Sequence, residues 1–555
     1  MKRIFLSLLL FATLSHAQKG LIAQKAMVVS AREEASQIGT EIMRQGGNAF
    51  DAMIATQLAL AVAYPYAGNL GGGGFMVYRL RNGETGTLDF REIAPMAASK
   101  NMFLDAHGNV IPDLSTDSGL AVGIPGTVAG IFAVHQKFGS FPLDKIFQPV
   151  IALAEKGVVV TPKQLVQIDE SKKAIIEING DKVFYNKTFK VGDTIKYPQL
   201  AQTLKRLLKN GRDEFYKGET AKKLVAFLQK KGGIITLKDL SSYEAKWRDP
   251  LKFTYKNLNI ISMAPPSSGG FCLAQIFKMI EPFDVFQLKH NSEKYIQVLT
   301  EAERRSFADR NFYLGDPDFV KIPTAQLLDM DYLYKRIESF SFAKATPSSE
   351  ISQGKVQFSE SDETTHFSIV DAKGNAVATT TTLNGAYGSK LLCEELGFFL
   401  NNEMDDFSAK PGSANFYGLV GAEANSIAPR KRMLSSMTPT IVERNGRLLM
   451  LLGSPGGSTI ITSILQTILN VAEFRMGMQQ AVNAPRFHHQ WLPDEIRFEP
   501  NGFDKILLES LGRKGYKINV GHAPVIGKVD AILLLPDGTL EGGADQRGDD
   551  RAAGF

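Results

Sequence analysis

Cysteine is scarce in this sequence, and the common metal-binding patterns are absent. Only Cys272 and Cys393 occur among 555 residues, too few for a disulfide scaffold even in an exported protein. Cys272 lies in an apolar stretch, where a cysteine is typically a small buried side chain. There is no Cys-x-x-Cys or His-Glu-x-x-His pattern, and the adjacent residues His488 and His489 do not share a face. We therefore predict no metal site.

Net charge is also low. The formal charge is +5, and the hydrophobic (44%) and charged (22%) fractions are those of an ordinary globular protein. The basic cluster at 430–432 is short and has no interleaved aromatic residues, so we predict no nucleic-acid partner. The length suggests several domains, although large α/β layers often form one unit.

The sequence lacks an apolar run long enough to span a bilayer. Ile4 to Leu14 is an apolar segment of roughly half the ~20 residues that a membrane span needs. It follows Lys2 and Arg3 and precedes a small-x-small site ending at Ala17, which is typical of a cleaved signal peptide. We predict a signal peptide over residues 1–17, no membrane anchor, and export to a periplasm or to the medium.

A β-hairpin is predicted two thirds of the way along the chain. Thr364 precedes an alternating, β-branched run, a turn at 371–375 follows, and a second run covers Ala376–Thr382. The polar segment Thr346–Ser361, directly upstream, is predicted to be exposed.

The first third of the chain predicts two helices and a glycine-rich strand entry. Helical patterns cover Glu33–Met43 and the alanine-rich stretch Ala49–Ala63. The run Gly71–Gly74 lies between a helix and a strand, the reverse of the order in a dinucleotide fingerprint, so we favour close backbone packing. A strand then ends near Arg91, whose guanidinium is suited to holding a carboxylate.

The second half combines acidic residues with a glycine turn. Residues 401–406 carry carboxylates at the end of an apolar strand, and 408–430 form a long loop of the kind that often covers a binding site. The turn Gly453–Ser458 joins a strand to a helix predicted over Thr459–Phe474. Free N–H groups at such a junction can hold an anion.

These segments together identify a family. The chain resembles the γ-glutamyltranspeptidases (glutathione hydrolases), members of the N-terminal nucleophile hydrolase superfamily, over essentially the whole chain after the leader. The matching segments are Asn69–Phe75, Asp89–Glu92, Pro265–Gly270, Tyr313–Pro317, Thr364–His366, Asn401–Phe407, Leu434–Met437 and Gly453–Ser458.

The resemblance implies an α+β fold, a four-layer αββα sandwich shared by two chains from one precursor. The precursor would cleave itself between Glu363 and Thr364, giving a large subunit of residues 18–363 and a small subunit of residues 364–555. The two subunits would remain together as a heterodimer. No metal or cofactor is implied.

The resemblance also assigns roles to single residues. Thr364 would be the nucleophile, and its α-amine would be the general base. Thr382 would tune Thr364 through a hydrogen bond. The N–H groups of Gly456 and Gly457 would form the oxyanion hole. The predicted substrate-binding residues are Arg91, Ser435 and Ser436 for an α-carboxylate, Asn384, Glu403 and Asp406 for an α-ammonium, and Tyr417 as a lid.

The implied reaction is cleavage of γ-glutamyl amides such as glutathione, with transfer to water or to an acceptor amino acid or dipeptide. Two alternatives remain at this stage. One is a related acylase acting on a glutaryl or polyglutamate amide, although a glutaryl group has no ammonium for Glu403 and Asp406. The other is an exported amino-acid-binding protein, which would need no nucleophile.

Four further predictions concern positions to which the resemblance assigns no catalytic or binding role. His366 is expected to pack or hydrogen-bond rather than act in catalysis, and Ser267–Ser268 is expected to be a structural turn. Met433 and Gln546 replace prolines that are common in bacterial relatives. We expect both replacements to change loop stiffness without removing a functional group, because proline mainly fixes φ.

Overall fold

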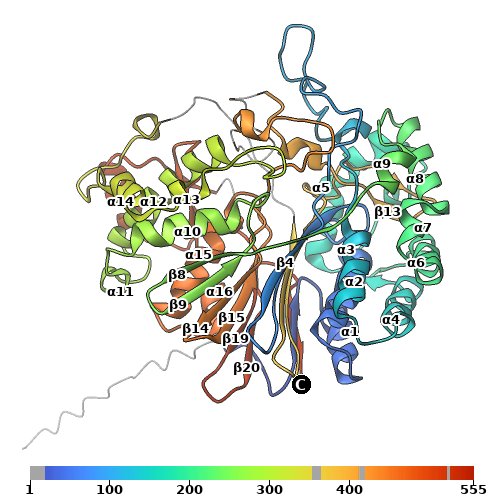
Figure 1. The fold of residues 1–555 in the computed structure, drawn as a ribbon, viewed down its shortest axis with the longest axis horizontal. Helices are drawn as coiled ribbons and strands as arrows, with labels where there is room; N and C mark the ends of the chain where they lie inside the picture. Colours follow the sequence, from blue (N-terminus) through green and yellow to red (C-terminus); the bar gives the residue numbers. More distant parts are fainter. Residues whose placement is uncertain are drawn as a thin grey trace, which may run out of the picture.

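The computed structural model describes residues 19–352, 364–410, 412, 415, 419, 421–521 and 525–555. Two β-sheets lie face to face in the centre, and a layer of helices covers the outer face of each sheet (Figure 1). The predicted αββα architecture is confirmed. The predicted signal peptide and Glu363 lie outside the described residues.

Both central sheets have seven strands, and all neighbouring strands are antiparallel. The first sheet has the order β21 (Arg551–Gly554), β2 (Met27–Ser30), β10 (Thr365–Val370), β11 (Ala376–Thr382), β3 (Gly73–Arg79), β4 (Thr85–Asp89) and β7 (Lys246–Arg248). The second has the order β1 (Leu21–Ala23), β20 (Leu540–Gly543), β19 (Asp530–Leu534), β15 (Arg447–Gly453), β14 (Thr440–Arg444), β9 (Leu258–Ser262) and β8 (Leu251–Tyr255).

The two helical layers come from different parts of the chain (Figure 1). Beside the first sheet lie α1 (Glu33–Arg44), α2 (Ala49–Ala63), α3 (Thr127–Phe138), α4 (Leu143–Lys156), α5 (Pro162–Asn179), α6 (Pro198–Asn210), α7 (Arg212–Tyr216), α8 (Glu219–Lys230) and α9 (Leu237–Ser241). On the side of the second sheet lie α10 (Gly269–Ile280), α11 (Val285–Leu288), α12 (Glu293–Tyr313), α13 (Thr324–Leu327), α14 (Met330–Ile337), α15 (Thr459–Ala472), α16 (Met478–Asn483) and α17 (Lys505–Arg513). Short strands occur at β5 (Val158–Val159), β6 (Thr194–Ile195), β12 (Leu392–Cys393), β13 (Phe398–Phe399), β16 (Phe487–His488), β17 (Ile496–Phe498) and β18 (Ile518–Val520).

The hairpin β10–β11 separates two apolar cores. Because side chains alternate along a strand, Phe367 and Ile369 of β10 join the core under the first helical layer, while Val370 joins the core between the sheets. Ser368, on the same face as Val370, donates its hydroxyl proton to the Asp530 carbonyl of the second sheet at 3.1 Å. The hairpin therefore has a buried face on both sides.

Most predicted elements are confirmed. Helix α2 has the predicted bounds and is buried throughout, as its alanine-rich sequence indicates. Strand β3 begins at Gly73, two residues earlier than predicted, because Gly73 and Gly74 pair with Thr382 and Thr381. A Cβ atom on Gly74 would lie 2.3 Å from the Thr380 carbonyl oxygen. The run Gly71–Gly74 thus serves close backbone packing, as expected.

Of the segment predicted to be exposed, residues 353–361 lie outside the described residues. Among the others, Pro347, Ser349, Glu350 and Ser352 are exposed as predicted, and two residues differ from the prediction. Ser348 and Ile351 are buried, and their carbonyls accept hydrogen bonds from the indole N–H of Trp491 at 3.2 and 3.1 Å. A polar composition suggested exposure, but the Ser348 hydroxyl donates to the Trp491 carbonyl at 2.6 Å and accepts from Arg304 at 2.5 Å, so it is satisfied in the interior. None of the described helices has the length and apolar character that crossing a bilayer requires.

Candidate active site

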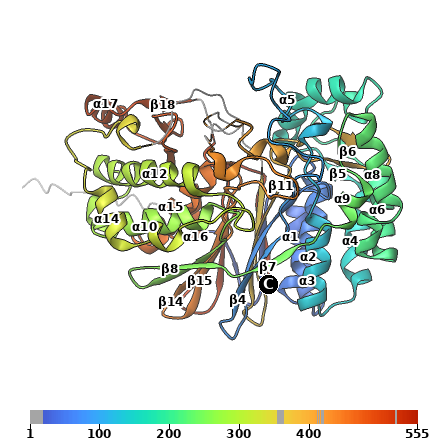
Figure 2. The same cartoon turned by 45° about the horizontal axis from the view of Figure 1, so that its top comes forward.

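Thr364 lies immediately before β10, at the open end of the central hairpin. Its side chain is buried, with 3% exposure, and its Oγ1 is 3.3 Å from Oγ1 of Thr382 at the end of β11. The Thr382 hydroxyl also accepts the backbone N–H of Asn384 at 2.7 Å. This end of β11 lies in the middle of the molecule, between the two helical layers (Figure 2). The hairpin thereby brings three predicted site residues together.

The predicted oxyanion turn reaches the same place from the second sheet. Strand β15 ends at Gly453, and α15 begins at Thr459. Gly456 has φ +126° and Gly457 has φ +52°, so both occupy backbone regions that favour glycine. Gly457 lines a cavity with Thr364 and Thr382. Gly456, the residue before it, is not among the residues that line this cavity. The turn therefore places at least one glycine against the threonine pair.

Arg91 is the centre of the predicted head-group site. It follows β4 and is 1% exposed. Its guanidinium lies 2.5 Å from a carboxylate oxygen of Glu403 and also pairs with Asp406. Glu403 and Asp406 are the ends of one 3₁₀ turn, Glu403–Asp406. Burial alone would lower the pKa of Arg91, but the surrounding carboxylates raise it above its usual range, so the guanidinium stays charged.

Sequence reasoning quoted Glu92 in a motif but gave it no role. Its side chain is fully buried 3.6 Å from the Arg91 guanidinium, and neither carboxyl oxygen has a hydrogen-bond partner among the described residues. Burial raises the pKa of Glu92 to about 8 and also raises the pKa values of Glu403 and Asp406. Three carboxyl groups therefore surround one arginine, and the cluster of three carboxyl groups holds protons at neutral pH.

The two predicted serines are positioned by a second arginine that sequence reasoning missed. Ser436 Oγ accepts from Arg310 of α12 at 3.2 Å, and Arg310 Nε donates to Ser268 Oγ at 3.1 Å. Ser268 in turn donates to the carbonyl of Ser435, through its N–H at 2.7 Å and its hydroxyl at 2.8 Å. The prediction that Ser267–Ser268 is a structural turn is confirmed. No local motif distinguishes Arg310 from the other charged residues of α12.

The long loop 408–430 contacts the site through its described residues. Asn415 donates its amide N–H to Asp406 Oδ1 at 3.1 Å, and Leu419 lines the cavity that contains Thr364. Tyr417, the predicted lid residue, lies outside the described residues. The cavity has a volume of about 20 Å³, little more than the ~10–15 Å³ that one water molecule needs. Arg91, Glu403 and Asp406 are among the residues that line it.

His366 has the structural role that was predicted. Its ring is fully buried, with Nδ1 2.8 Å from Thr380 Oγ1 and Nε2 3.1 Å from Ser368 Oγ. Burial lowers the pKa of His366 to about 3, so the ring is neutral at physiological pH. A Cβ atom on Gly453 would lie 2.1 Å from Nδ1, which shows how closely β15 approaches the hairpin here.

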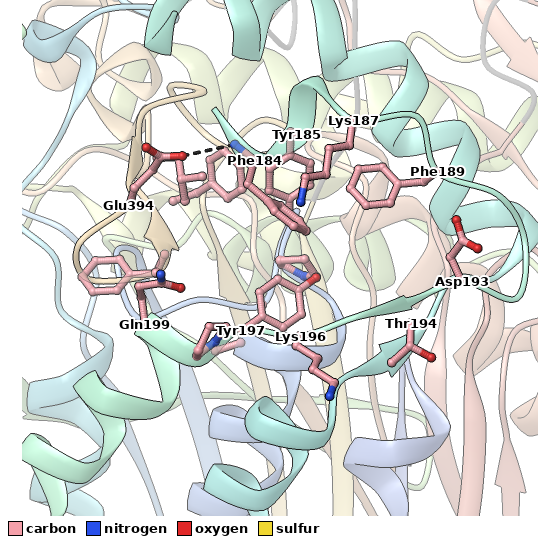
Figure 3. A pocket seen from close by; sticks show the side chains of 18 of the residues that line it. Phe184, Tyr185, Lys187, Phe189, Asp193, Thr194, Lys196, Tyr197, Gln199 and Glu394 are labelled. Carbon is pink, nitrogen blue, oxygen red and sulfur yellow. Dashed lines mark hydrogen bonds between the residues drawn. The ribbon is translucent and has the colours of Figure 1, made fainter. Parts of the chain in front are cut away.

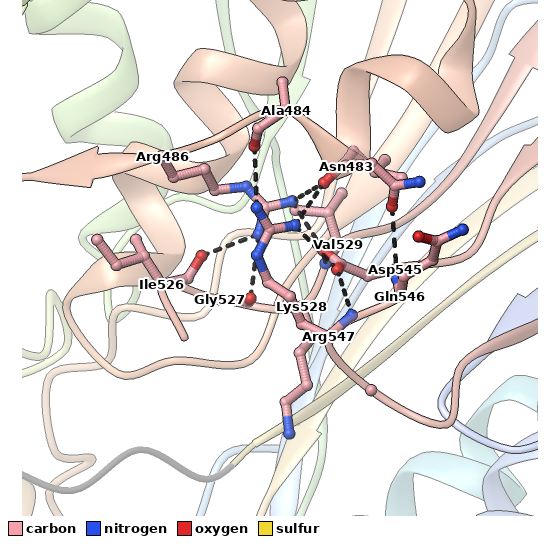
Figure 4. Close-up of polar contacts among 12 residues, drawn as sticks. Asn483, Ala484, Arg486, Ile526, Gly527, Lys528, Val529, Asp545, Gln546 and Arg547 are labelled. Carbon is pink, nitrogen blue, oxygen red and sulfur yellow. Dashed lines mark hydrogen bonds and ion pairs between the residues drawn. The ribbon is translucent and has the colours of Figure 1, made fainter. Parts of the chain in front are cut away.

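The two proline replacements lie in well-connected loops. Met433 is fully buried, and its carbonyl oxygen is 3.5 Å from Arg91 Nε. The backbone N–H of Gln546, which a proline would lack, donates to Asn483 Oδ1 at 3.4 Å (Figure 4). Ion pairs from Arg486 and Arg547 to Asp545 hold the same turn. Both loops are thus held by neighbouring contacts without proline.

Comparisons with known proteins agree with this geometry. The family model "Gamma-glutamyltranspeptidase" matches residues 35–555. The "Glutathione hydrolase proenzyme" of Escherichia coli (strain K12) is 45% identical over 544 residues, covering 96% of this chain and 92% of that protein.

Two solved structures are also similar. The crystal structure of Helicobacter pylori γ-glutamyltranspeptidase is 41% identical with a TM-score of 0.58, and covers 62% of this chain and 98% of that chain. A cephalosporin acylase from Bacillus halodurans has the same fold, with a TM-score of 0.85 at 24% identity and 97% coverage of both chains. Since the family model spans almost the whole chain and a relative at 45% identity covers nearly all of it, this chain belongs to the γ-glutamyltranspeptidase family.

Proposed function

We propose that the protein is a self-processing γ-glutamyltranspeptidase and glutathione hydrolase that works through a γ-glutamyl ester on Thr364. One observation carries the proposal. Thr364, at the start of a central strand, shares a buried cavity with Thr382, Gly457 and the Arg91–Glu403–Asp406 cluster. A hydroxyl nucleophile, an oxyanion turn and a charged head-group site are thereby adjacent. The name of the Escherichia coli relative, a glutathione hydrolase proenzyme, supports this function.

Processing makes Thr364 an N-terminus. The Thr364 hydroxyl adds to the Glu363 carbonyl, the peptide C–N bond breaks, and the nitrogen takes a proton to become the α-amine of Thr364. Water then hydrolyses the Glu363 ester. The products are a large subunit of residues 18–363, after removal of the signal peptide 1–17, and a small subunit of residues 364–555. Because the strands of both sheets come from both subunits, the subunits remain together as a heterodimer.

Catalysis then uses the new amine. Its unperturbed pKa of roughly 7.7–8 gives a useful fraction of free base at neutral pH. The amine removes the hydroxyl proton as Thr364 Oγ1 attacks the γ-carbonyl, and the N–H groups of Gly456 and Gly457 stabilise the oxyanion. The leaving amine takes the proton, and the ester is resolved by water or by an acceptor amino acid or dipeptide. Before cleavage the nitrogen is an amide and cannot accept a proton.

Recognition of the substrate requires an exchange of partners. In the structure, Arg91 pairs with Glu403 and Asp406. The α-carboxylate of a γ-glutamyl group would take Arg91, with Ser435 and Ser436, and its α-ammonium would take the freed carboxylates and Asn384. Each broken ion pair is replaced by one of the same type, so a zwitterion can enter without leaving a buried charge unpaired. Tyr417 would close over the bound group.

The related-acylase alternative is less well supported. A glutaryl group has a carboxylate for Arg91 but no ammonium, so Glu403 and Asp406 would lose their cation and gain none. The similarity to the cephalosporin acylase concerns the fold. The leader sequence supports export, and the protein would act in a periplasm or in the medium.

The test combines intact-mass analysis with an assay of γ-glutamyl-p-nitroanilide, with and without an acceptor dipeptide. We expect wild-type protein in two chains that divide between residues 363 and 364, and anilide release that the dipeptide accelerates. Thr364→Ala should remain one inactive chain, while the matched Thr364→Ser, which keeps a hydroxyl, should still be cleaved. Correctly processed protein that releases no anilide would refute the proposal. A single unprocessed chain that binds amino acids would favour a binding protein instead.

A further inference from the structure

Arg310, near the C-terminal end of α12, is a buried cation whose hydrogen bonds all go to neutral groups. It is 4% exposed, and its guanidinium donates to Ser268 Oγ at 3.1 Å, Ser436 Oγ at 3.2 Å and Asn311 Oδ1 at 2.9 Å. Among the described residues, no carboxylate forms an ion pair with it. Burial lowers its pKa, but a guanidinium remains charged in proteins. A buried charge without a counter-ion is costly, so packing alone does not explain Arg310.

The two serines of the cavity have hydroxyl protons that no described residue accepts. Ser436 Oγ accepts from Arg310, and Ser435 Oγ accepts from the backbone N–H of Met437 at 3.1 Å. Neither hydroxyl donates to a described residue, although both serines line the cavity of Thr364. A hydroxyl that accepts one hydrogen bond can direct its proton to another acceptor, and accepting from a cation strengthens it as a donor. The serine pair is therefore arranged to donate to a group that enters the cavity.

Arg310 itself is not among the residues that line this cavity. Its charge would reach a ligand through Ser436 and across a buried region, where charges interact more strongly than in water. The charge of Arg310 also acts on Asp406, but that carboxylate already pairs with Arg91. An anion beside Ser436 is thus the partner that this cation lacks.

We propose that Arg310 is a positioning residue that sets the affinity of the site for the α-carboxylate of the substrate. It holds the Ser436 hydroxyl as a donor to that carboxylate and places a second positive charge behind it, in addition to Arg91. This role rests on the proposed function, which brings a γ-glutamyl head group to the serines. A ligand without an α-carboxylate would leave Arg310 without an anion.

The test measures anilide release by the processed protein and, separately, calorimetric binding of L-glutamate. Arg310→Met should raise the KM for γ-glutamyl-p-nitroanilide and the Kd for L-glutamate by roughly 10- to 100-fold, the equivalent of one hydrogen bond to a charged group. The kcat should stay within about threefold, because the α-carboxylate is bound equally in the ground state and in the transition state. The groups that accept from Arg310 are neutral, so the substitution leaves no buried anion unpaired and should permit folding. Arg310→Lys, which keeps the charge but not the planar fork, should give a smaller rise.

Two variants separate this role from a structural one. Arg305→Met removes another buried arginine of α12, one that pairs with Glu301 at 2.6 Å. It should lower stability without changing the KM or the Kd. In a Ser436→Ala background, Arg310→Met should weaken binding by about threefold at most, because the hydroxyl that links the arginine to the carboxylate is gone.

A further variant shows which cavity holds the glutamate. A second cleft, lined largely by the segments Phe184–Gln199 and Leu392–Phe399, has Lys187 in its wall (Figure 3). The same wall carries the acids Asp193 and Glu394, so its charges do not select an anion. Lys187→Met should therefore leave the Kd for L-glutamate unchanged.

The behaviour of wild-type protein distinguishes the two proposals. If it binds L-glutamate but releases no anilide, the proposed function fails, and the Kd of Arg310→Met still tests the role of Arg310. Wild-type protein that neither binds L-glutamate nor releases anilide would refute both. Unchanged KM and Kd in Arg310→Met, a loss confined to kcat, an equal rise in Arg305→Met, or a full effect in the Ser436→Ala background would each overturn the role of Arg310. If Arg310→Met is not processed, unchanged KM and Kd in Arg310→Lys would overturn it.

Discussion

The hydroxyl of Thr382 offers a sharp test of the proposed catalytic arrangement. It lies 3.3 Å from the Thr364 hydroxyl and accepts the backbone N–H of Asn384 at 2.7 Å, and all three residues are buried. Thr382→Val replaces this hydroxyl by a methyl group of similar size. The substitution removes both interactions while the strand and its packing stay in place.

The expected losses of stability and of kcat follow from these two contacts. The Asn384 N–H would lose its acceptor inside the protein, which costs about 1–3 kcal/mol of stability. A hydrogen bond to a reacting group that gains charge contributes about 1.5–3 kcal/mol, so kcat should fall by roughly 10- to 100-fold. KM should change less, because Thr382 contacts the head-group residue Asn384 through the backbone N–H of Asn384 and not through the Asn384 side chain.

Steady-state anilide assays and urea unfolding measure the two effects. The same strand supplies a matched control, Thr379→Val, because the buried Thr379 hydroxyl has no hydrogen-bond partner among the described residues. That variant should stay within about twofold of wild type in kcat and about 0.5 kcal/mol in stability. If Thr382→Val behaves like Thr379→Val, then Thr382 has no special role beside Thr364, and the proposed arrangement is wrong.

Two further predictions concern the head-group site and the oxyanion turn. The folded-state pKa of Glu92, about 8, exceeds its ordinary value of ~4.3, so the folded protein keeps a proton that the unfolded chain releases. Stability should therefore fall between about pH 4.5 and 8, and Glu92→Gln should reduce that slope by up to ~1.4 kcal/mol per pH unit in urea titrations; an unchanged slope contradicts this. Gly456→Ala should lower kcat without abolishing folding, because φ is +126° and a Cβ atom would lie 2.3 Å from Thr459 Oγ1. Gly512→Ala, at an open helical position, should leave kcat unchanged; equal kcat values in the two variants would contradict the role of the turn.

Much of the fold could be predicted because local patterns agree with it. Helix α2 is alanine-rich and buried on every side, and the hairpin β10–β11 has alternation and a turn of suitable residues. Boundaries were less certain where glycine had a packing role. Gly73 and Gly74 are strand residues although glycine disfavours strands, because neither position has room for a side chain. A Cβ atom would lie 2.3 Å from the Thr380 carbonyl oxygen of β11 at Gly74, and 2.5 Å from the Phe90 carbonyl oxygen at Gly73.

Only those site residues that lie within sequence motifs could be predicted. Thr364, Thr382, Arg91, Glu403 and Asp406 meet in one cavity although they come from separated segments. Arg310 could not be found in this way, because its role depends on the approach of α12 to the loop of Ser436. The pairing of Arg91 with the two acids could not be found either. The resemblance assigned them to opposite ends of a ligand, and only the structure shows that they contact each other.

That pairing has a consequence for specificity. Arg91 is buried with three carboxyl groups whose pKa values burial raises, so the site balances its own charge by ion pairs and by protonation. A ligand with only a carboxylate would take Arg91 and leave the acids without a cation, and a ligand with only an amine would do the reverse. In the first case the acids would have to take up protons, and in the second Arg91 would remain an unpaired buried charge, which costs about 3–5 kcal/mol. A zwitterionic head group would satisfy both sides at once, and we therefore propose that the charge balance of the site selects an α-amino acid group.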